Sequence, residues 1–266
     1  MQIAFRQFDF GKGILRSPWV GLTFFQQFFK SPLLPTLLYN TIGIRLYSLL
    51  AGFPLPILLA ISLNEAGSRR YKKTVQMVTY APYFISTVVF VGMILQVLDL
   101  RSGIINVLMK LVGGQAVNFM GNSRSFWPIY VWSGIWQGTG HSAIIYLAAL
   151  AGIDPTLHEA AIVDGATKPE RIRHIDLPGI TRTIVILLIL SAGSVMNVGF
   201  EEFFLMQNPL NQSSSEVIAT YVYKVGLVSG SYSFSTGVGL FNSVVSFVIL
   251  VAVNFVARRV GETSLW

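Results

Sequence analysis

Long uncharged segments alternate with short charged segments along most of this chain. Five intervals contain no Asp, Glu, Lys or Arg: 46–64, 74–98, 125–153, 183–200 and 225–257. A helix needs about 20 mainly apolar residues to cross the hydrocarbon core of a bilayer, where the backbone must satisfy its own hydrogen bonds. The pattern therefore predicts an all-α, polytopic membrane bundle with spans near 36–62, 76–98, 127–150, 183–205 and 237–257.

The basic residues between these spans indicate an orientation. They cluster after the first, third and fifth predicted spans: Arg69, Arg70, Lys72 and Lys73; Lys168, Arg171, Arg173 and Arg182; Arg258 and Arg259. Loops rich in Lys and Arg stay in the cytoplasm, so we expect that side, including the tail 258–266, to be cytoplasmic. Segments 99–126 and 206–236 are then external, and the first should hold a short helix on the outer membrane surface.

The beginning of the chain does not fit this alternation. Five spans place segment 1–35 outside, although it carries positive charges that resist export: Arg6, Lys12, Arg16 and Lys30. We therefore expect a further span before Met1 in the full protein, giving six spans with both ends cytoplasmic. The chain itself would comprise an external segment, 1–35, a membrane domain, 36–257, and the tail.

Composition excludes several other classes of protein. The chain is 53% hydrophobic and 12% charged, whereas soluble domains carry about 25% charged residues. The net charge of +7 sits in short clusters between apolar runs, so we expect a lipid bilayer and no nucleic acid as its surroundings. There is no cysteine for a disulfide or thiolate metal site. His141, His158 and His174 lack metal-ligand spacing, and we expect no enzymatic activity.

The loop between the third and fourth spans contains signals for two short helices. Asp154 can cap a helix with Pro155 at its first position, and this helix should end near Gly165. Pro169 can open a second helix. That helix should end before Pro178, because a residue that precedes proline is disfavoured in the helical region.

The same loop, residues 151–182, carries a family resemblance. Glu159-Ala160-Ala161, three residues, Gly165, nine residues and Ile175-x-Leu177-Pro178 resemble the EAA signature of binding-protein-dependent permeases in residue type and spacing. In that family the loop is a coupling helix that seats in a groove on an ATPase subunit. The resemblance implies this coupling role for Glu159, Ala160, Ala161, Asp164, Gly165, Ile175, Leu177 and Pro178. The plainer interpretation is an ordinary capped helix–turn–helix.

Other segments resemble the oligosaccharide branch of these permeases. Among them are Trp19-Val20-Gly21-Leu22, Leu63-Asn64-Glu65, Asn208-Pro209 and Ser264-Leu265-Trp266. The resemblance implies a type I importer permease in the bacterial inner membrane, forming half of a pathway for an oligosaccharide that could be acidic. It also implies partners: a second permease subunit, in a heterodimer or homodimer, two ATPase subunits and an extracellular solute-binding protein. Because the chain lacks a G-x-x-x-x-G-K-[ST] loop, ATP and Mg²⁺ should bind to the ATPase subunits.

Polar residues within the spans are candidates for the substrate pathway. Arg45 lies about 13 Å into the first span and could attract an anionic substrate or extend towards the membrane surface. In maltose-type permeases the spans on either side of the loop contact sugar. This resemblance indicates Gln137, Gly138 and His141 before the loop, and Val198 and Gly199 after it, with Asn197 adjacent. The flat ring of Trp136 would suit a sugar ring, and Glu201 could bind hydroxyl groups. Packing is the alternative for the tryptophans and glycines.

Three other functions stay open at this point. The same importer could carry a peptide or an amino acid. The chain could also be a membrane scaffold without a transport cycle, or an independent channel or secondary transporter. The last class would not need the coupling loop, and the inverted repeats of many such folds are not apparent.

Overall fold

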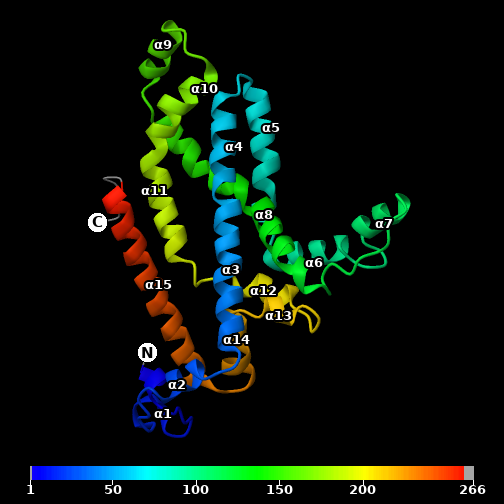
Figure 1. Cartoon of the computed structure of the whole chain (residues 1–266), viewed down its shortest axis with the longest axis vertical. Coiled ribbons are helices and arrows are strands. Elements are labelled where there is room, and N and C mark those ends of the chain that lie inside the picture. Colours follow the sequence, from blue (N-terminus) through cyan, green and yellow to red (C-terminus); the bar gives the residue numbers. More distant parts are fainter. Residues whose placement is uncertain (1, 261–266) are drawn as a thin grey trace. The chain divides into compact units, whose positions relative to one another are not determined.

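The computed structural model describes residues 2–260, and this part of the chain contains helices and no β-strand (Figure 1). The predicted all-α class is confirmed. Residues 261–266, which include Ser264-Leu265-Trp266 and most of the predicted tail, lie outside the described part.

The α-helices follow the chain in this order: α1 Gly13–Arg16, α2 Thr23–Phe29, α3 Leu34–Gly52, α4 Pro54–Glu65, α5 Arg69–Tyr80, α6 Thr87–Val97, α7 Ile104–Leu111, α8 Ser123–Ala151, α9 Pro155–Val163, α10 Lys168–Arg171, α11 Leu177–Gly193, α12 Phe200–Met206, α13 Gln212–Ser215, α14 Ile218–Tyr223 and α15 Tyr232–Val260. Two 3₁₀ turns, η1 Gln2–Phe5 and η2 Ala81–Phe84, and two π-helical turns, η3 Ile172–Asp176 and η4 Lys224–Val228, complete the set.

The chain divides into two compact units. Unit 1 comprises Met1–Leu46, Thr87–Ile129 and Gly193–Leu250, and unit 2 comprises Tyr47–Ser86, Tyr130–Ala192 and Val251–Trp266. The core of unit 1 joins α2, α3, α14 and α15 through Phe28, Leu37, Met196, Ile218, Phe234 and Val238. The core of unit 2 joins α4, α8 and α11 through Ala60, Ile61, Ala143, Tyr146, Leu150 and Ile180.

Three helical stretches in the described residues are long and apolar enough to cross a membrane: Leu34–Glu65, Lys168–Gly193 and Tyr232–Arg259. The first is interrupted at Phe53, directly before Pro54 and Pro56 in the first turn of α4, because proline cannot donate the backbone hydrogen bond of a continuous helix. Predicted span 127–150 lies within α8. This helix has 29 residues but falls short in apolar content, because polar residues and glycines occupy its middle.

Predicted span 76–98 is wrong as a single straight helix. The chain forms α5 with η2 and then α6, and the two parts bend by 101°. Pro82 lacks an N–H donor and lies in the tighter 3₁₀ turn, and Ile85 is extended, so the helix cannot continue into Ser86. The bend separates the basic residues at the start of α5 from the apolar residues of α6.

Predicted span 183–205 is wrong at its far end. Helix α11 ends at Gly193, residues 197–199 are not helical, and Glu201 lies in the separate helix α12. Glycine and asparagine are weak helix formers, and this linker contains Gly193, Asn197 and Gly199. A Cβ atom on Gly193 would lie 2.5 Å from Leu250 Cδ1, so a larger residue at this position would displace the Leu250 side chain. The short helix expected within 99–126 is present as α7.

Candidate functional site

The loop 151–182 begins with the capped helix expected from the sequence. The side chain of Asp154 accepts a hydrogen bond from the backbone N–H of Thr156 at 3.0 Å, and Pro155 occupies the first helical position. Hydrogen bonds from the backbone and side chain of Thr156 hold the pKa of Asp154 below its usual value. The start of α9 is therefore fixed by local contacts alone.

Gly165 ends α9 with a Schellman motif. Its φ angle is +80°, a conformation that L side chains rarely adopt. The N–H of Ala166 donates to Ala161 O at 2.9 Å, and the N–H of Gly165 donates to Ile162 O at 3.1 Å. A Cβ on Gly165 would meet nothing within 4 Å, so the backbone angle, not packing, requires glycine here.

Helix α9 presents both charged and apolar side chains to its surroundings. Glu159, Ala160 and Asp164 are exposed, and Ala161 is half-buried. Three large apolar side chains are exposed beside them, and Val163 reaches 87% exposure: Leu157, Ile162 and Val163. An exposed apolar surface with a polar rim is typical of a protein interaction site.

The second half of the loop differs from the prediction. Glu170 closes a capping box with Thr167, whose N–H and Oγ1 both donate to Glu170 Oε2 at 2.7 Å. The helix does not end before Pro178, because α10 continues through η3 into α11. A π-helical turn is wider than an α-helical turn, and this one accommodates the proline, which cannot donate a hydrogen bond.

This continuity divides the EAA-type motif between two environments. Its first part lies on the exposed helix α9. Ile175 is half-buried in η3, Leu177 packs on the core of unit 2, and Pro178 is exposed at the start of α11. The motif thus joins an exposed helix to the base of a membrane helix.

Basic side chains of the neighbouring segments bind the end of α4. Lys72 Nζ donates to Asn64 O at 2.9 Å, and Lys168 Nζ donates to Glu65 O at 3.4 Å. Arg171 Nη2 lies 3.5 Å from Glu65 Oε2. The two lysines satisfy carbonyl groups that a helix C-terminus leaves unpaired, and all three cations lie at the negative end of its dipole.

The polar residues of α8 bind the broken segment between α5 and α6. Gln137 Nε2 donates to Ile85 O at 3.2 Å, which satisfies a carbonyl freed by the break. The ring of His141 stacks on Tyr83, with centroids 3.7 Å apart and planes at 5°. Tyr83 and Ile85 were not predicted from the sequence, in which Pro82 is the local signal for this break.

Two glycines of α8, Gly138 and Gly140, differ in how closely other backbone approaches them. A Cβ on Gly140 would lie 2.1 Å from Thr79 O, whereas a Cβ on Gly138 would meet nothing within 4 Å. Gly140 therefore allows α8 to approach the backbone of α5. Trp136 is exposed, and Trp132 Nε1 donates to Tyr47 OH at 3.1 Å. Whether Trp136, Gly138 or the polar residues beside them meet a substrate stays a prediction.

The remaining pathway candidates lie in unit 1. Arg45 Nη2 donates to Ser194 Oγ at 2.7 Å, and its Nε is buried without a hydrogen-bond partner in the described structure. This contact brings Arg45 to the linker that precedes Asn197 and Gly199, both of which are exposed. Glu201 is also exposed, in the first turn of α12.

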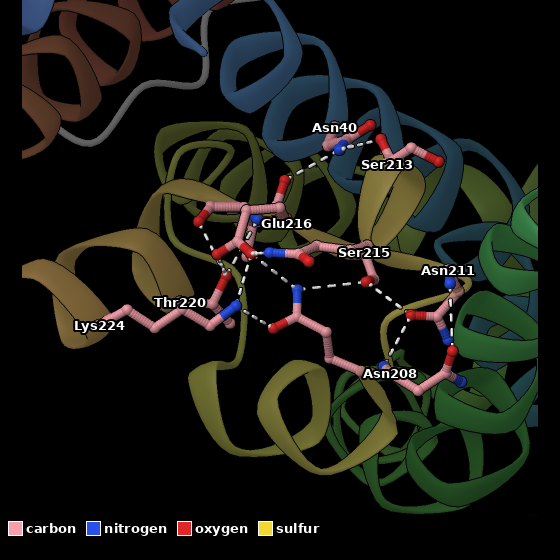
Figure 2. A network of polar contacts seen from close by, with 11 residues as sticks. Asn40, Asn208, Asn211, Ser213, Ser215, Glu216, Thr220 and Lys224 are labelled. Carbon is pink, nitrogen blue, oxygen red and sulfur yellow. Dashed lines mark hydrogen bonds and ion pairs between the residues drawn. The ribbon is translucent and has the colours of Figure 1, made fainter. Parts of the chain in front are cut away.

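A dense polar network in unit 1 was not predicted from the sequence (Figure 2). Its centre is the largely buried carboxylate of Glu216, which forms an ion pair with Lys224 at 2.5 Å. The carboxylate also accepts hydrogen bonds from Thr220, Gln207 and Gln212 at 2.8, 3.1 and 2.9 Å. Asn40 of α3 donates to the Glu216 carbonyl at 2.9 Å and to the Ser213 carbonyl at 3.0 Å.

The network joins α3 to the segment between α12 and α14. Asn208 and Asn211 extend it, since the side chain of each donates to Met120 O, at 2.8 and 3.0 Å. Within residues 2–260, no group of three or more His, Cys, Asp or Glu side chains could hold a metal ion.

Comparison with known proteins places the chain in a family. Residues 52–262 match the family described as binding-protein-dependent transport system inner membrane component. The polygalacturonan/rhamnogalacturonan transport system permease protein YteP of Bacillus subtilis (strain 168) is 41% identical over 264 residues, which cover 99% of this chain and 82% of YteP.

Solved structures give the same result. A chain of a bacterial ABC transporter involved in the import of the acidic polysaccharide alginate superimposes with a TM-score of 0.90 at 39% identity, covering 97% of this chain and 87% of that chain. The bacterial alginate ABC transporter in complex with an alginate pentasaccharide-bound periplasmic protein gives a TM-score of 0.88 at 39% identity, covering 92% and 85%. This chain therefore belongs to the binding-protein-dependent transport system inner membrane components, the family of ABC importer permeases that its EAA-type loop resembles.

Proposed function

We propose that this chain forms half of the translocation pathway of an ATP-driven importer for acidic oligosaccharides. The observation that carries the proposal is the nearly full-length likeness to the alginate transporter chain and to YteP. The first is named for import of the acidic polysaccharide alginate, and the second for transport of polygalacturonan and rhamnogalacturonan. An extracellular solute-binding protein would deliver the sugar, and a second permease subunit would form the other half of the pathway.

The energy for transport would come from partner ATPase subunits, which would bind ATP and Mg²⁺, while this chain would need no cofactor. The exposed helix α9 supports this role, because it offers the apolar surface and the glutamate of the EAA-type motif to a partner. Loop 151–182 and the end of α15 would face the cytoplasm, as the basic residues indicate.

Arg45 supports the choice of an acidic substrate. Its guanidinium lies in the apolar helix α3, and the linker partner that it contacts is the neutral Ser194. Ionisable residues within a membrane helix are rare and usually functional. A cation at this place would favour a carboxylate of the passing sugar over a neutral hydroxyl group.

The proposal is tested by ATP hydrolysis of the assembled importer in lipid, with both permeases, the ATPase subunits and the binding protein present. We expect oligogalacturonides or alginate oligosaccharides to stimulate hydrolysis, and neutral oligosaccharides of equal length to have little effect. Dependence on the binding protein shows that stimulation passes through the importer.

Gly165→Arg supplies the matched variant for the ATPase contact. It should leave the chain inserted but abolish binding of the ATPase subunits. An intact complex that responds only to neutral sugars, peptides or amino acids would refute the substrate class. A chain that binds no ATPase subunit would refute the importer and favour a scaffold.

A further inference from the structure

One buried acidic residue in the loop has no part in the function proposed so far. Asp176 is 0% exposed, and neither oxygen of its carboxylate has a hydrogen-bond partner among the described residues. It lies at the last position of η3, directly before the start of α11. A carboxylate buried without donors destabilises a fold unless a cation lies beside it.

The nearest basic side chain to Asp176 comes from α9. His158 Nε2 lies 3.4 Å from Asp176 Oδ1, within ion-pair distance, and the His158 side chain is 23% exposed. Arg171 and Glu65, which form their own ion pair, are also within electrostatic range of Asp176. Acidic and basic side chains from α9, η3, α10 and the end of α4 therefore meet at one place in unit 2.

This pair matters because α9 has little other packing. Among its residues only His158 and Ala161 are not exposed, and these two lie one helical turn apart on the same face. Within the described part of the chain, His158 makes the one ion pair that joins α9 to another element. The covalent connection to α10 passes through the turn at Gly165, which by itself does not fix the direction of α9.

We propose that His158 and Asp176 are positioning residues that make α9 and the first turn of α11 move as one body. Displacement of α9 by its partner then reaches the membrane helix directly, instead of being absorbed by the turn at Gly165. The inference rests on the proposed docking of an ATPase subunit on α9. It adds the contact through which that docking acts on the pathway.

The test uses the fully assembled importer with Asp176→Asn, His158→Gln and the double variant. Retention of the ATPase subunits is measured by co-purification, and coupling is measured as the ratio of substrate-stimulated to basal hydrolysis. We expect retention to be unchanged and the ratio to fall at least about fivefold in each single variant, the low end of coupling between sites. In the double variant this ratio should be no lower than in the more impaired single variant, because the two substitutions remove the same contact.

Two further variants separate charge from packing. His158→Lys places a cation of different shape opposite Asp176 and should retain most of the stimulation, which a purely steric role of His158 would not allow. His174→Gln removes an exposed histidine of the same turn and should behave like the unaltered chain. If Asp176→Asn does not assemble, the His158 variants provide the same comparison, because α9 is exposed.

The outcomes also separate this inference from the proposed function. Normal stimulation in both single variants, or losses that multiply in the double variant, would overturn the positioning role while leaving the importer in place. Failure of the unaltered chain to retain an ATPase subunit would overturn the proposed function, and this inference with it.

Discussion

Replacing Glu216 with alanine removes an acceptor shared by four side chains. In the intact network the carboxylate receives Lys224 Nζ at 2.5 Å, Thr220 Oγ1 at 2.8 Å, Gln212 Nε2 at 2.9 Å and Gln207 Nε2 at 3.1 Å. Breaking a buried ion pair by removing one partner costs about 3–5 kcal/mol. The Lys224 side chain is 34% exposed, so water screens part of this cost. We therefore expect Glu216→Ala to lower the free energy of unfolding by about 2–3 kcal/mol.

The assay is thermal unfolding of the purified chain in detergent, followed by tryptophan fluorescence. Trp127 is a suitable reporter, because its Nε1 donates to Ser214 O at 2.9 Å, within the segment that holds the network. A loss of this size should lower the midpoint by about 4–12 °C, at about 2–4 °C per kcal/mol for a chain of this length. Glu201→Ala is the control, since Glu201 is exposed on α12.

Equal midpoints for Glu216→Ala and Glu201→Ala would refute the argument that the network stabilises unit 1. A second comparison checks the electrostatic part of the argument. Glu216→Ala combined with Lys224→Met should recover part of the loss, because the unpaired cation is removed along with the carboxylate. A double variant less stable than Glu216→Ala would show that Lys224 contributes through other contacts.

Three further predictions concern single positions. Gly140→Ala should lower the free energy of unfolding by about 1–3 kcal/mol, because the added methyl group meets Thr79 O at 2.1 Å. Gly138→Ala should leave it unchanged, and thermal unfolding of the two variants measures the difference. Arg45→Gln should weaken uptake of acidic oligosaccharides more than that of neutral ones in proteoliposomes, and equal effects would remove the case for charge recognition. Gly165→Asn should retain ATPase subunits better than Gly165→Ala, because asparagine tolerates the φ angle of +80°, and co-purification of the subunits measures this difference.

Much of the helix content could be predicted from local patterns. The uncharged intervals locate most of the membrane helices, because lipid requires long apolar segments whatever their neighbours are. The cap at Asp154 and the end at Gly165 were also predictable, since each depends on contacts within a few residues. These features need no knowledge of tertiary structure.

The failures concern contacts between distant segments. The break after Pro82 is stabilised by Gln137, whose amide bonds Ile85 O across 52 positions of the chain. Asn40 bonds the Glu216 carbonyl across 176 positions. Such pairs leave no periodic pattern in a single sequence, so the bend between α5 and α6 and the network around Glu216 were missed.

The candidate site was predicted in part. The motif residues of α9 are mostly exposed, as a docking role requires, but His158 and Asp176 were not singled out because neither belongs to the motif. Gln137 and His141 share a face of α8, as the helical spacing predicts, and that face packs on the broken segment. Their predicted contact with a sugar stays open to the uptake experiments.

The lysines at the end of α4 carry a constraint on how this protein can change. Lys72 and Lys168 belong to the basic clusters from which the orientation was predicted, and they also bond the carbonyl groups of Asn64 and Glu65. A lysine that contributed only to membrane topology could occupy any neighbouring position of its loop. Moving either Lys72 or Lys168 would leave a carbonyl group at the end of α4 without its donor. Relocating them to invert the topology would therefore also destabilise the end of α4.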